Sequence, residues 1–370
     1  MKTKLESLLI VLAVLAGVHQ TTAQVTNLGI APASGGQAVL YWPVSTTNYV
    51  LQTTANLAAP NWVTASHAVT VNAATVTNSA PSGFFRLQPV TVPASMALIP
   101  AGWFTMGDTL DGESDAIPTN IYVSAFVMDV NLVNFSLWQT VYNAATTFFG
   151  YSFDDAGAGK GTNYPVERVN WYDCVKWCNA RSQLAGLTPC YYTDAGFTQV
   201  YNTGDMDTVY VNWNASGFRL PTEAEWEKAA RGGLSGCRFP WGNLISESQA
   251  NYLGYPTAYS YDRGPDGYNS VGSIGGTGPA TSPVGSFDVN GYGLNDMAGN
   301  VFEWCWDWSG TPYGQPSTIN PTGAGLATGI RVLRGGNWNG NADSARCAFR
   351  GSVGPGFAID AFGFRCVRGL

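Results

Sequence analysis

The stretch Gly217-Phe-Arg-Leu-Pro-Thr-Glu-Ala-Glu-Trp226 predicts the start of a helix. Thr222 and Glu225 have the spacing of a capping box, in which each side chain satisfies a free backbone N–H group of the first turn. Gly232 follows the last apolar residues, so we expect the helix to end at about Ala230. Glutamates in a first turn also compensate the helix dipole. We therefore interpret the cluster of Glu223, Glu225 and Glu227 as structural rather than catalytic.

Two further helices are expected upstream. Asn170 is a suitable N-cap for a helix that carries Asp173 in its first turn and ends at Gly186. An earlier helix is expected from about 134 to 145. Long loops rich in Gly, Pro, Tyr and Asn separate or follow these helices, notably 251–293. Such loops are uncommon in compact domains, so we expect metals, disulfides or a function to hold them.

Residues 24–93 differ in composition from the rest of the chain. They are poor in charge and rich in Val, Thr, Ala and Asn. Short alternating runs, separated by Gly, Pro and Asn, occur at 38–42, 49–53 and 84–87. This pattern is typical of a small all-β module, for which we expect a spacer or adhesive role. The run that contains Pro93 is expected to link the module to a second domain, 94–370.

Residues 1–23 have the pattern of a secretory signal peptide. Lys2 and Lys4 precede an apolar run from Leu8 to Val18, and small residues follow. The run of about 11 residues is too short for a bilayer, which takes about 20. We therefore expect an exported protein, secreted, periplasmic or at the cell surface, with no membrane span. Removal of this segment would make the net charge of −7 one unit more negative, which disfavours nucleic acid as a partner.

The histidine and cysteine content restricts the chemistry. His19 and His67 are the two histidines, and both precede the second domain. A three-histidine iron or zinc centre is therefore excluded, and a Ser-His-Asp or Cys-His couple is disfavoured. The seven cysteines of an exported chain are expected to include disulfides, with at least one cysteine unpaired. No Cys-x-x-Cys pair is present, which disfavours a zinc or thioredoxin-like site.

Seven blocks of the second domain occur in a characteristic order. They are Met96–Gly107, Gly217–Trp226, Phe239–Asn243, Asn290–Leu294, Met297–Trp304, Arg331–Gly336 and Gly363–Cys366. Together they resemble the formylglycine-generating enzyme, or sulfatase-modifying factor, family. The resemblance covers about 96–370 and implies an α+β fold, this family's loop-rich variant of the C-type lectin fold. It does not extend to the β module.

The resemblance implies an oxidase in which two cysteines bind copper(I) and a substrate cysteine is converted to formylglycine with oxygen. Counted from Gly336, the two positions fall on Gly340 and Ala345, which offer no thiolate to copper(I). Three other family positions differ in residue type, at Phe302, Asn337 and Ala361. The superfamily's iron branch needs three histidines, and none follows His67. Copper is therefore not expected; an oxidase with another cysteine arrangement is the alternative hypothesis.

The resemblance also implies a calcium loop. Its ligands would be the carboxylates of Asp296 and Glu303 and the backbone carbonyls of Gly299 and Val301. An all-oxygen set of this kind suits a hard cation such as Ca²⁺. The alternative is that the two acids are exposed and unpaired. A second family site would begin at Asn251, with Asp262 or Asp266 as the candidate aspartate.

Cys178 and Cys366 match a family disulfide that joins a helix to the last strand. Closing so long a loop would stabilise the fold by about 4 to 5 kcal/mol at most. The family partner of Cys347 would stand at Ala230, so Cys347 pairs elsewhere or stays free. The pairing of the other cysteines stays open, although Cys174, Trp177 and Cys178 are expected on one buried helix face.

The C-terminal segment has a biased composition. From Asn339 to Leu370 there is no Lys, Glu, Gln, Met or Trp, the amino acids whose codons end only in A or G. The segment thus also resembles the variable region of proteins that retroelements diversify at adenines. We hypothesise an exposed ligand-binding surface formed by Asn337, Trp338, Gly340, Ser344, Phe349, Ser352, Val353, Phe357, Ile359 and Phe362. The alternative is drift in an inactive site.

The favoured hypothesis is a secreted, monomeric, calcium-stabilised family member that binds a protein or a glycan at this surface, without the oxidase's chemistry. Trp304, Trp306 and Trp308 alternate as in a strand. We interpret them as core residues rather than as a sugar-stacking platform.

Overall fold

The computed structural model describes residues 29–32, 37–41, 49–54, 58–60, 62–64, 69–70, 73–77, 84–89, 92–110, 112, 116–273, 280–310, 313 and 317–370. Contacts divide the chain into two units. One holds the residues up to Val92 together with 100–103 and Leu370, and the other holds 93–99 and 104–369. The expected signal peptide lies outside the described residues.

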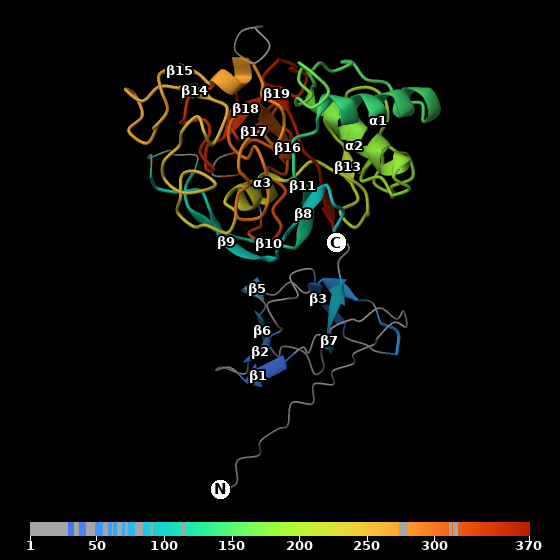
Figure 1. Ribbon diagram of the computed structural model, residues 1–370. Helices are drawn as coiled ribbons and strands as arrows, with labels where there is room; N and C mark the ends of the chain where they lie inside the picture. The colour runs from blue at the N-terminus through green and yellow to red at the C-terminus, as the bar shows by residue number, and fades with distance from the viewer. Residues whose placement is uncertain are drawn as a thin grey trace. The chain divides into compact units, whose positions relative to one another are not determined.

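The described part of the first unit consists of strands (Figure 1). They are β1 (Gly29–Pro32), β2 (Gln37–Tyr41), β3 (Tyr49–Thr54), β4 (Val63–Thr64), β5 (Val69–Thr70), β6 (Ala73–Thr77) and β7 (Phe84–Pro89). They form two antiparallel sheets, of order β1-β2-β6-β5 and β4-β3-β7. The three alternating runs of the sequence correspond to β2, β3 and β7. Leu40 and Leu51 are buried, as alternation in a half-buried strand requires.

The second unit combines short strands with helices and long loops. The strands that pair near its start and end are β8 (Met96–Ile99), β9 (Gly102–Met106), β10 (Thr119–Val123), β11 (Phe126–Asp129) and β20 (Val367–Gly369). The central sheet has the order β18-β17-β16-β19. Its members are β16 (Phe302–Trp308), β17 (Arg331–Arg334), β18 (Gly351–Val353) and β19 (Phe362–Gly363). This mixture of small sheets and helices is an α+β architecture.

Two further strand pairs are formed by the loops. They are β12 (Tyr191–Tyr192) with β13 (Tyr210–Val211), and β14 (Leu253–Gly254) with β15 (Gly267–Tyr268), followed by the 3-10 helix η2 (Ser270–Ser273). In the view of Figure 1, the β14–β15 pair lies on one side of the central sheet, and α1 and α2 lie on the other. No helix in the described part of the chain has the length and apolar character needed to cross a membrane.

The three helices begin where the sequence predicts. They are α1 (Phe135–Phe148), α2 (Trp171–Leu184) and α3 (Glu223–Ala230). Asn134 and Asn170 cap α1 and α2, and both hydrogen bonds of the Thr222–Glu225 capping box are present. These starts were predictable because capping is decided within four residues. α1 ends three residues later than expected, since its helical hydrogen bonds continue as far as the bond from Phe149 N to Ala145 O.

The helix α2 is buried on all sides rather than on one face. Every residue from Trp171 to Ser182 is buried, including Asp173 and Lys176. Trp177 stacks on Trp138 of α1, with ring centroids 5.6 Å apart and planes 4° apart. Cys174, Trp177 and Cys178 are buried as expected, and the remaining faces of the helix are buried as well. A helix that is covered all round lies in the centre of its unit.

The helix α3 is held by buried ion pairs. Glu227 pairs with Arg231 and Arg334 and accepts a hydrogen bond from Gly107 N at 2.7 Å. Glu223 pairs with Arg350 at 2.6 Å. These contacts join α3 to β17 and to the loops at both ends of the unit. They fix the position of the segment that follows β17, which carries the candidate site.

Candidate functional site

The loop after β17 contains the positions at which the oxidase would hold copper. Gly340 accepts a hydrogen bond from Leu253 N at 2.9 Å and donates one to Asn337 O at 3.1 Å. Ala345 is fully buried in an apolar cluster with Phe239 and Ile245. A backbone turn and a buried methyl group therefore stand where copper(I) would need two thiolates. The residues present do not fit this metal.

The loop is closed by a glycine that cannot carry a side chain. Gly336 has φ +74°, and a Cβ there would lie 2.9 Å from Ser344 O and 3.0 Å from the Cα of Ala345. The chain leaves the sheet at Gly336 and returns against the same point eight residues later. The double glycine at the end of β17 is thus explained by this close backbone approach.

The thiol nearest in sequence to this loop is buried. Cys347 is inaccessible, and burial raises its pKa to about 12. All seven cysteines lie in the described part, and Cys237 is the one that is not fully buried. A nucleophilic or metal-binding cysteine needs a thiolate at ordinary pH. Cys347 does not meet this requirement.

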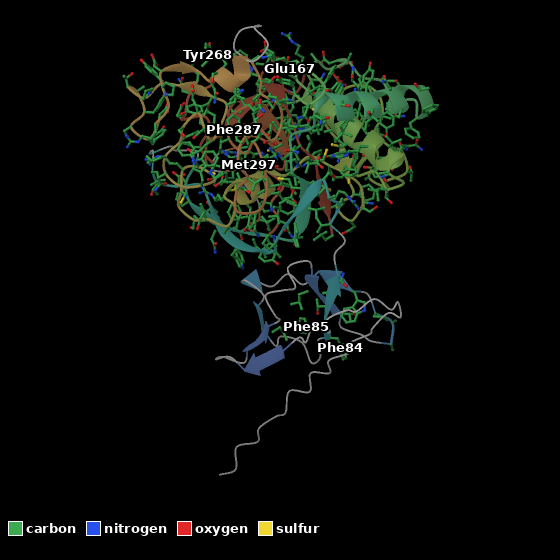
Figure 2. All side chains as sticks on the ribbon, in the orientation of Figure 1. Phe84, Phe85, Glu167, Tyr268, Phe287 and Met297 are labelled. Carbon is green, nitrogen blue, oxygen red and sulfur yellow. The ribbon has the colours of Figure 1, made fainter. Side chains whose placement is uncertain are left out.

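An aromatic contact joins this loop to β15. The rings of Tyr268 and Trp338 have centroids 6.1 Å apart, and the Tyr268 hydroxyl donates to Asn339 Oδ1 at 2.9 Å. Tyr268, which is 45% exposed, is labelled beside the β14–β15 pair in Figure 2. Sequence reasoning did not single out Tyr268. The available signal was the run of five tyrosines between 252 and 268.

The same aromatic pair adjoins exposed residues of the C-terminal segment. Trp338 Nε1 donates to Asp360 O at 3.0 Å, which places the indole beside the turn that carries Ile359. Phe357 and Ile359 are 58% and 42% exposed. We call Tyr268, Trp338, Phe357 and Ile359 the apolar patch. Exposed apolar groups that gather in this way are typical of an interaction surface.

Charged residues border the apolar patch. Asp360 forms an exposed ion pair with Arg168 at 3.4 Å. Burial, and after it the nearby Asp360, raise the pKa of Glu167 to about 7 against the opposing effect of Arg168 and Lys160. Glu167 therefore changes its charge near neutral pH. The patch thus has a rim whose net charge depends on pH.

The ten predicted ligand-binding residues differ in exposure. Ser352, Phe357 and Ile359 are exposed; Trp338, Gly340, Phe349 and Val353 are partly buried. Asn337, Ser344 and Phe362 are buried, so the exposure expected for them is not observed. Phe362 belongs to β19, which pairs with β16. Its ring lies edge-on to that of Trp304, with the ring centroids 5.5 Å apart. Ser344 is buried because its hydroxyl donates to Asn341 O at 2.8 Å inside the loop.

The four predicted calcium ligands lie in or beside a buried turn. Asp296 and Glu303 are both buried, which excludes the alternative of exposed acids. Asp296 Oδ2 accepts from Gly285 N at 2.8 Å, while Oδ1 has no hydrogen-bond partner. An unpartnered buried carboxylate oxygen suits a cation. Both oxygens of Glu303 accept from Arg365, at 2.7 and 3.0 Å, so an ion would share Glu303 with this guanidinium.

No group of three or more His, Cys, Asp or Glu side chains within the described ranges is arranged to hold a metal ion. A calcium ion at Asp296 would therefore depend on backbone carbonyls such as those of Gly299 and Val301. At the second family position, Asp262 accepts hydrogen bonds from Tyr252, Tyr255 and Gly264, so its role is to hold the loop. Asp266 is exposed and stays the candidate aspartate for that position.

The two cysteines of the predicted disulfide are neighbours. Cys178 Sγ and Cys366 Sγ are 3.6 Å apart, and both residues are fully buried as thiols. Burial raises the pKa of Cys178 well above its ordinary value. The separation exceeds a bond length of about 2.05 Å but is within reach of one. The disulfide stays a prediction that this geometry suits.

The acidic cluster of α3 and the tryptophan run of β16 both have structural environments. Glu225 caps its helix and pairs with Arg219 at 2.6 Å, and the other two glutamates are in the buried ion pairs described above. Trp304 and Trp308 are buried and Trp306 is partly so. The guanidinium of Arg331 lies 3.6 and 3.4 Å from the ring centroids of Trp171 and Trp308. A buried cation here occupies the aromatic faces that a sugar would need.

Comparison with family models supports the interpretation of the sequence blocks. Residues 81–370 match the sulfatase-modifying factor enzyme 1-like domain. The chain belongs to this family. The match begins before residue 94 and includes β7.

Relatives of this chain are named for different activities. The formylglycine-generating enzyme of Thermomonospora curvata is 32% identical over 308 residues, which cover 76% of this chain and 96% of the relative. A serine/threonine-protein kinase pkn1 of Chlamydia caviae is 42% identical over 288 residues, which cover 77% of this chain but 40% of the relative. Membership in the family therefore identifies the scaffold, and the activity has to be argued from the site.

A solved structure extends the comparison to the fold. Treponema denticola variable protein 1 is 32% identical, with a TM-score of 0.58 over 74% of this chain and 94% of that chain. The similarity confirms that the second unit has the fold of this family.

Proposed function

We propose that this protein is a non-catalytic, ligand-binding member of the sulfatase-modifying factor family. One observation carries the proposal: Gly340 and Ala345 stand at the positions of the copper-binding cysteines, and Ala345 is packed in an apolar cluster. Copper(I) needs soft sulfur ligands, and neither a glycine nor an alanine supplies one. The scaffold is thus retained without the chemistry of the oxidase.

The apolar patch would be the binding surface, in the region where the oxidase holds its active site. Support comes from its exposed side chains and from Tyr268 and Trp338 among its three aromatic residues, because Tyr and Trp are enriched among the residues that dominate the binding energy of protein interfaces. The similarity to a solved variable protein and the biased composition after Asn339 favour a surface that differs between copies of the gene. The ligand would be a protein or a glycan.

Several properties of the molecule belong to the same proposal. The N-terminal pattern supports export, and the unpartnered oxygen of Asp296 supports a structural calcium ion. The adjacency of Cys178 and Cys366 supports a disulfide in an oxidising compartment. The fold would be this family's variant of the C-type lectin fold, and the protein a monomer. The second candidate function is an oxidase, favoured by the similarity to the Thermomonospora enzyme.

An activity assay separates the two functions. Purified protein is incubated with Cu(I), oxygen and a cysteine-containing sulfatase peptide, and the loss of the peptide thiol and the appearance of an aldehyde are measured. We expect neither change, while the Thermomonospora enzyme under the same conditions converts the peptide. Aldehyde formed by this chain above the level of a Cu(I) blank would falsify the non-catalytic assignment.

A further inference from the structure

The sequence contains two Asn-Gly pairs, Asn290–Gly291 and Asn339–Gly340. Asparagine before glycine is prone to deamidation, because no Cβ hinders attack of the glycine nitrogen on the asparagine side chain. The reaction requires an accessible amide and a backbone that can rotate. The two pairs have opposite environments, so the structure distinguishes between them.

Both polar atoms of the Asn290 side-chain amide are hydrogen-bonded. Its Nδ2 donates to Ala229 O at 2.7 Å and to Ala230 O at 3.1 Å, and its Oδ1 accepts from Tyr292 N and Leu294 N. The residue is buried, and a Cβ on Gly291 would lie 2.2 Å from Gly232 O. Rotation of this side chain toward its own backbone would break four hydrogen bonds.

Asn339 is exposed at the edge of the apolar patch. Its Oδ1 accepts the Tyr268 hydroxyl at 2.9 Å. A hydrogen bond to this oxygen draws electrons from the carbonyl carbon and favours attack on it. The turn is held by Gly340 N donating to Asn337 O at 3.1 Å. Asn339 N also donates to Asn337 Oδ1 at 2.9 Å within this turn. The contact of Gly340 N is the one that must open, because this nitrogen is the attacking atom.

We propose that Asn339 is a deamidation site in the apolar patch and that Asn290 is protected. The backbone nitrogen of Gly340 attacks Asn339 Cγ, a C–N bond forms, and the side-chain nitrogen leaves as ammonia. The resulting succinimide takes up one water and opens to aspartate or isoaspartate. The net change is water consumed and ammonia released, with no redox step. The inference does not depend on the proposed function.

The modification would change the chemistry of the patch. A carboxylate would replace a neutral amide beside the Tyr268 hydroxyl, next to a rim that already carries Asp360. Isoaspartate would also lengthen the backbone between Trp338 and Gly340, whose carbonyl holds Leu253. An aged sample would therefore contain molecules with chemically different forms of the apolar patch.

The test is incubation of the full chain at mildly alkaline and mildly acidic pH, followed by peptide mapping by mass spectrometry and an isoaspartate assay. We expect conversion at Asn339 that is faster at alkaline pH, with Asn290 intact over the same period. In denaturant, both pairs should convert at similar rates. Tyr268→Phe should slow conversion at Asn339 in the folded protein but not in denaturant, and Gly340→Ala should slow it in both.

A short peptide with the sequence 337–343 gives the reference rate. Conversion of folded Asn339 within about tenfold of the peptide supports the proposal. The proposal is overturned if Asn339 stays intact after the peptide has fully converted, because the turn would then protect it. It is also overturned if Asn290 and Asn339 convert equally fast in the folded protein, because local structure would then play no part.

Discussion

The surroundings of α3 and the apolar patch differ in which side chains they bury: charged groups are buried around α3, whereas apolar groups are exposed at the patch. Around α3, glutamates and arginines are removed from water in pairs, such as Glu227 with Arg334. At the patch, Phe357 and Ile359 stay in water beside the exposed pair of Arg168 and Asp360. Exposed apolar groups contribute little to folding. The difference separates residues that hold the scaffold from residues that are exposed to solvent and contribute little to its stability.

The largest effect is expected from breaking the buried network. Glu227→Ala leaves Arg231 and Arg334 buried without their main partner and frees Gly107 N. We expect a loss of about 3 to 5 kcal/mol in the free energy of unfolding, measured by urea denaturation.

The matched control for this change is the exposed pair. Asp360→Ala should lower the free energy of unfolding by less than about 1 kcal/mol, because exposed ion pairs are solvated and screened. Equal losses for the two variants would remove the distinction between the two regions.

A smaller effect is expected from the titration of Glu167. Its carboxyl has a pKa of about 7 in the folded protein, against 4.5 for an ordinary glutamate. The folded state then binds more protons than the unfolded state between these values, so stability falls as pH rises through this window and levels off above it. Urea midpoints across the window should show this slope in the wild type and a shallower one in Glu167→Gln. An unchanged slope in the variant would place the titrating group elsewhere.

The smallest effect on stability is expected at the patch itself. Phe357→Ser should change the free energy of unfolding by less than about 0.5 kcal/mol. It should nevertheless reduce retention on a phenyl column, because it removes the most exposed side chain of the apolar patch. Phe148→Ser is the control, since Phe148 is 77% exposed at the end of α1. Equal loss of retention in the two variants would mean that the patch is no more than scattered apolar residues.

The sequence predicts the scaffold better than the site. The starts of α2 and α3 follow from Asn170 and Thr222, because capping depends on neighbouring residues. The burial of Phe362 depends on pairing with β16, some sixty residues away in the chain, which no local pattern reveals. Tyr268 was missed for the same reason: it reaches the patch only because β15 lies against the loop that carries Asn339.

The absence of the copper site is the central claim, and a Cu(I) competition titration tests it most directly. The reduced protein is titrated anaerobically into a chromophoric Cu(I) chelate, with Gly340→Cys/Ala345→Cys as the comparison. We predict that the wild type leaves the chelate intact, because six of its seven thiols are buried and Cys237 stands alone. The double variant should withdraw copper. Withdrawal of one equivalent of Cu(I) by the wild-type protein would contradict the account.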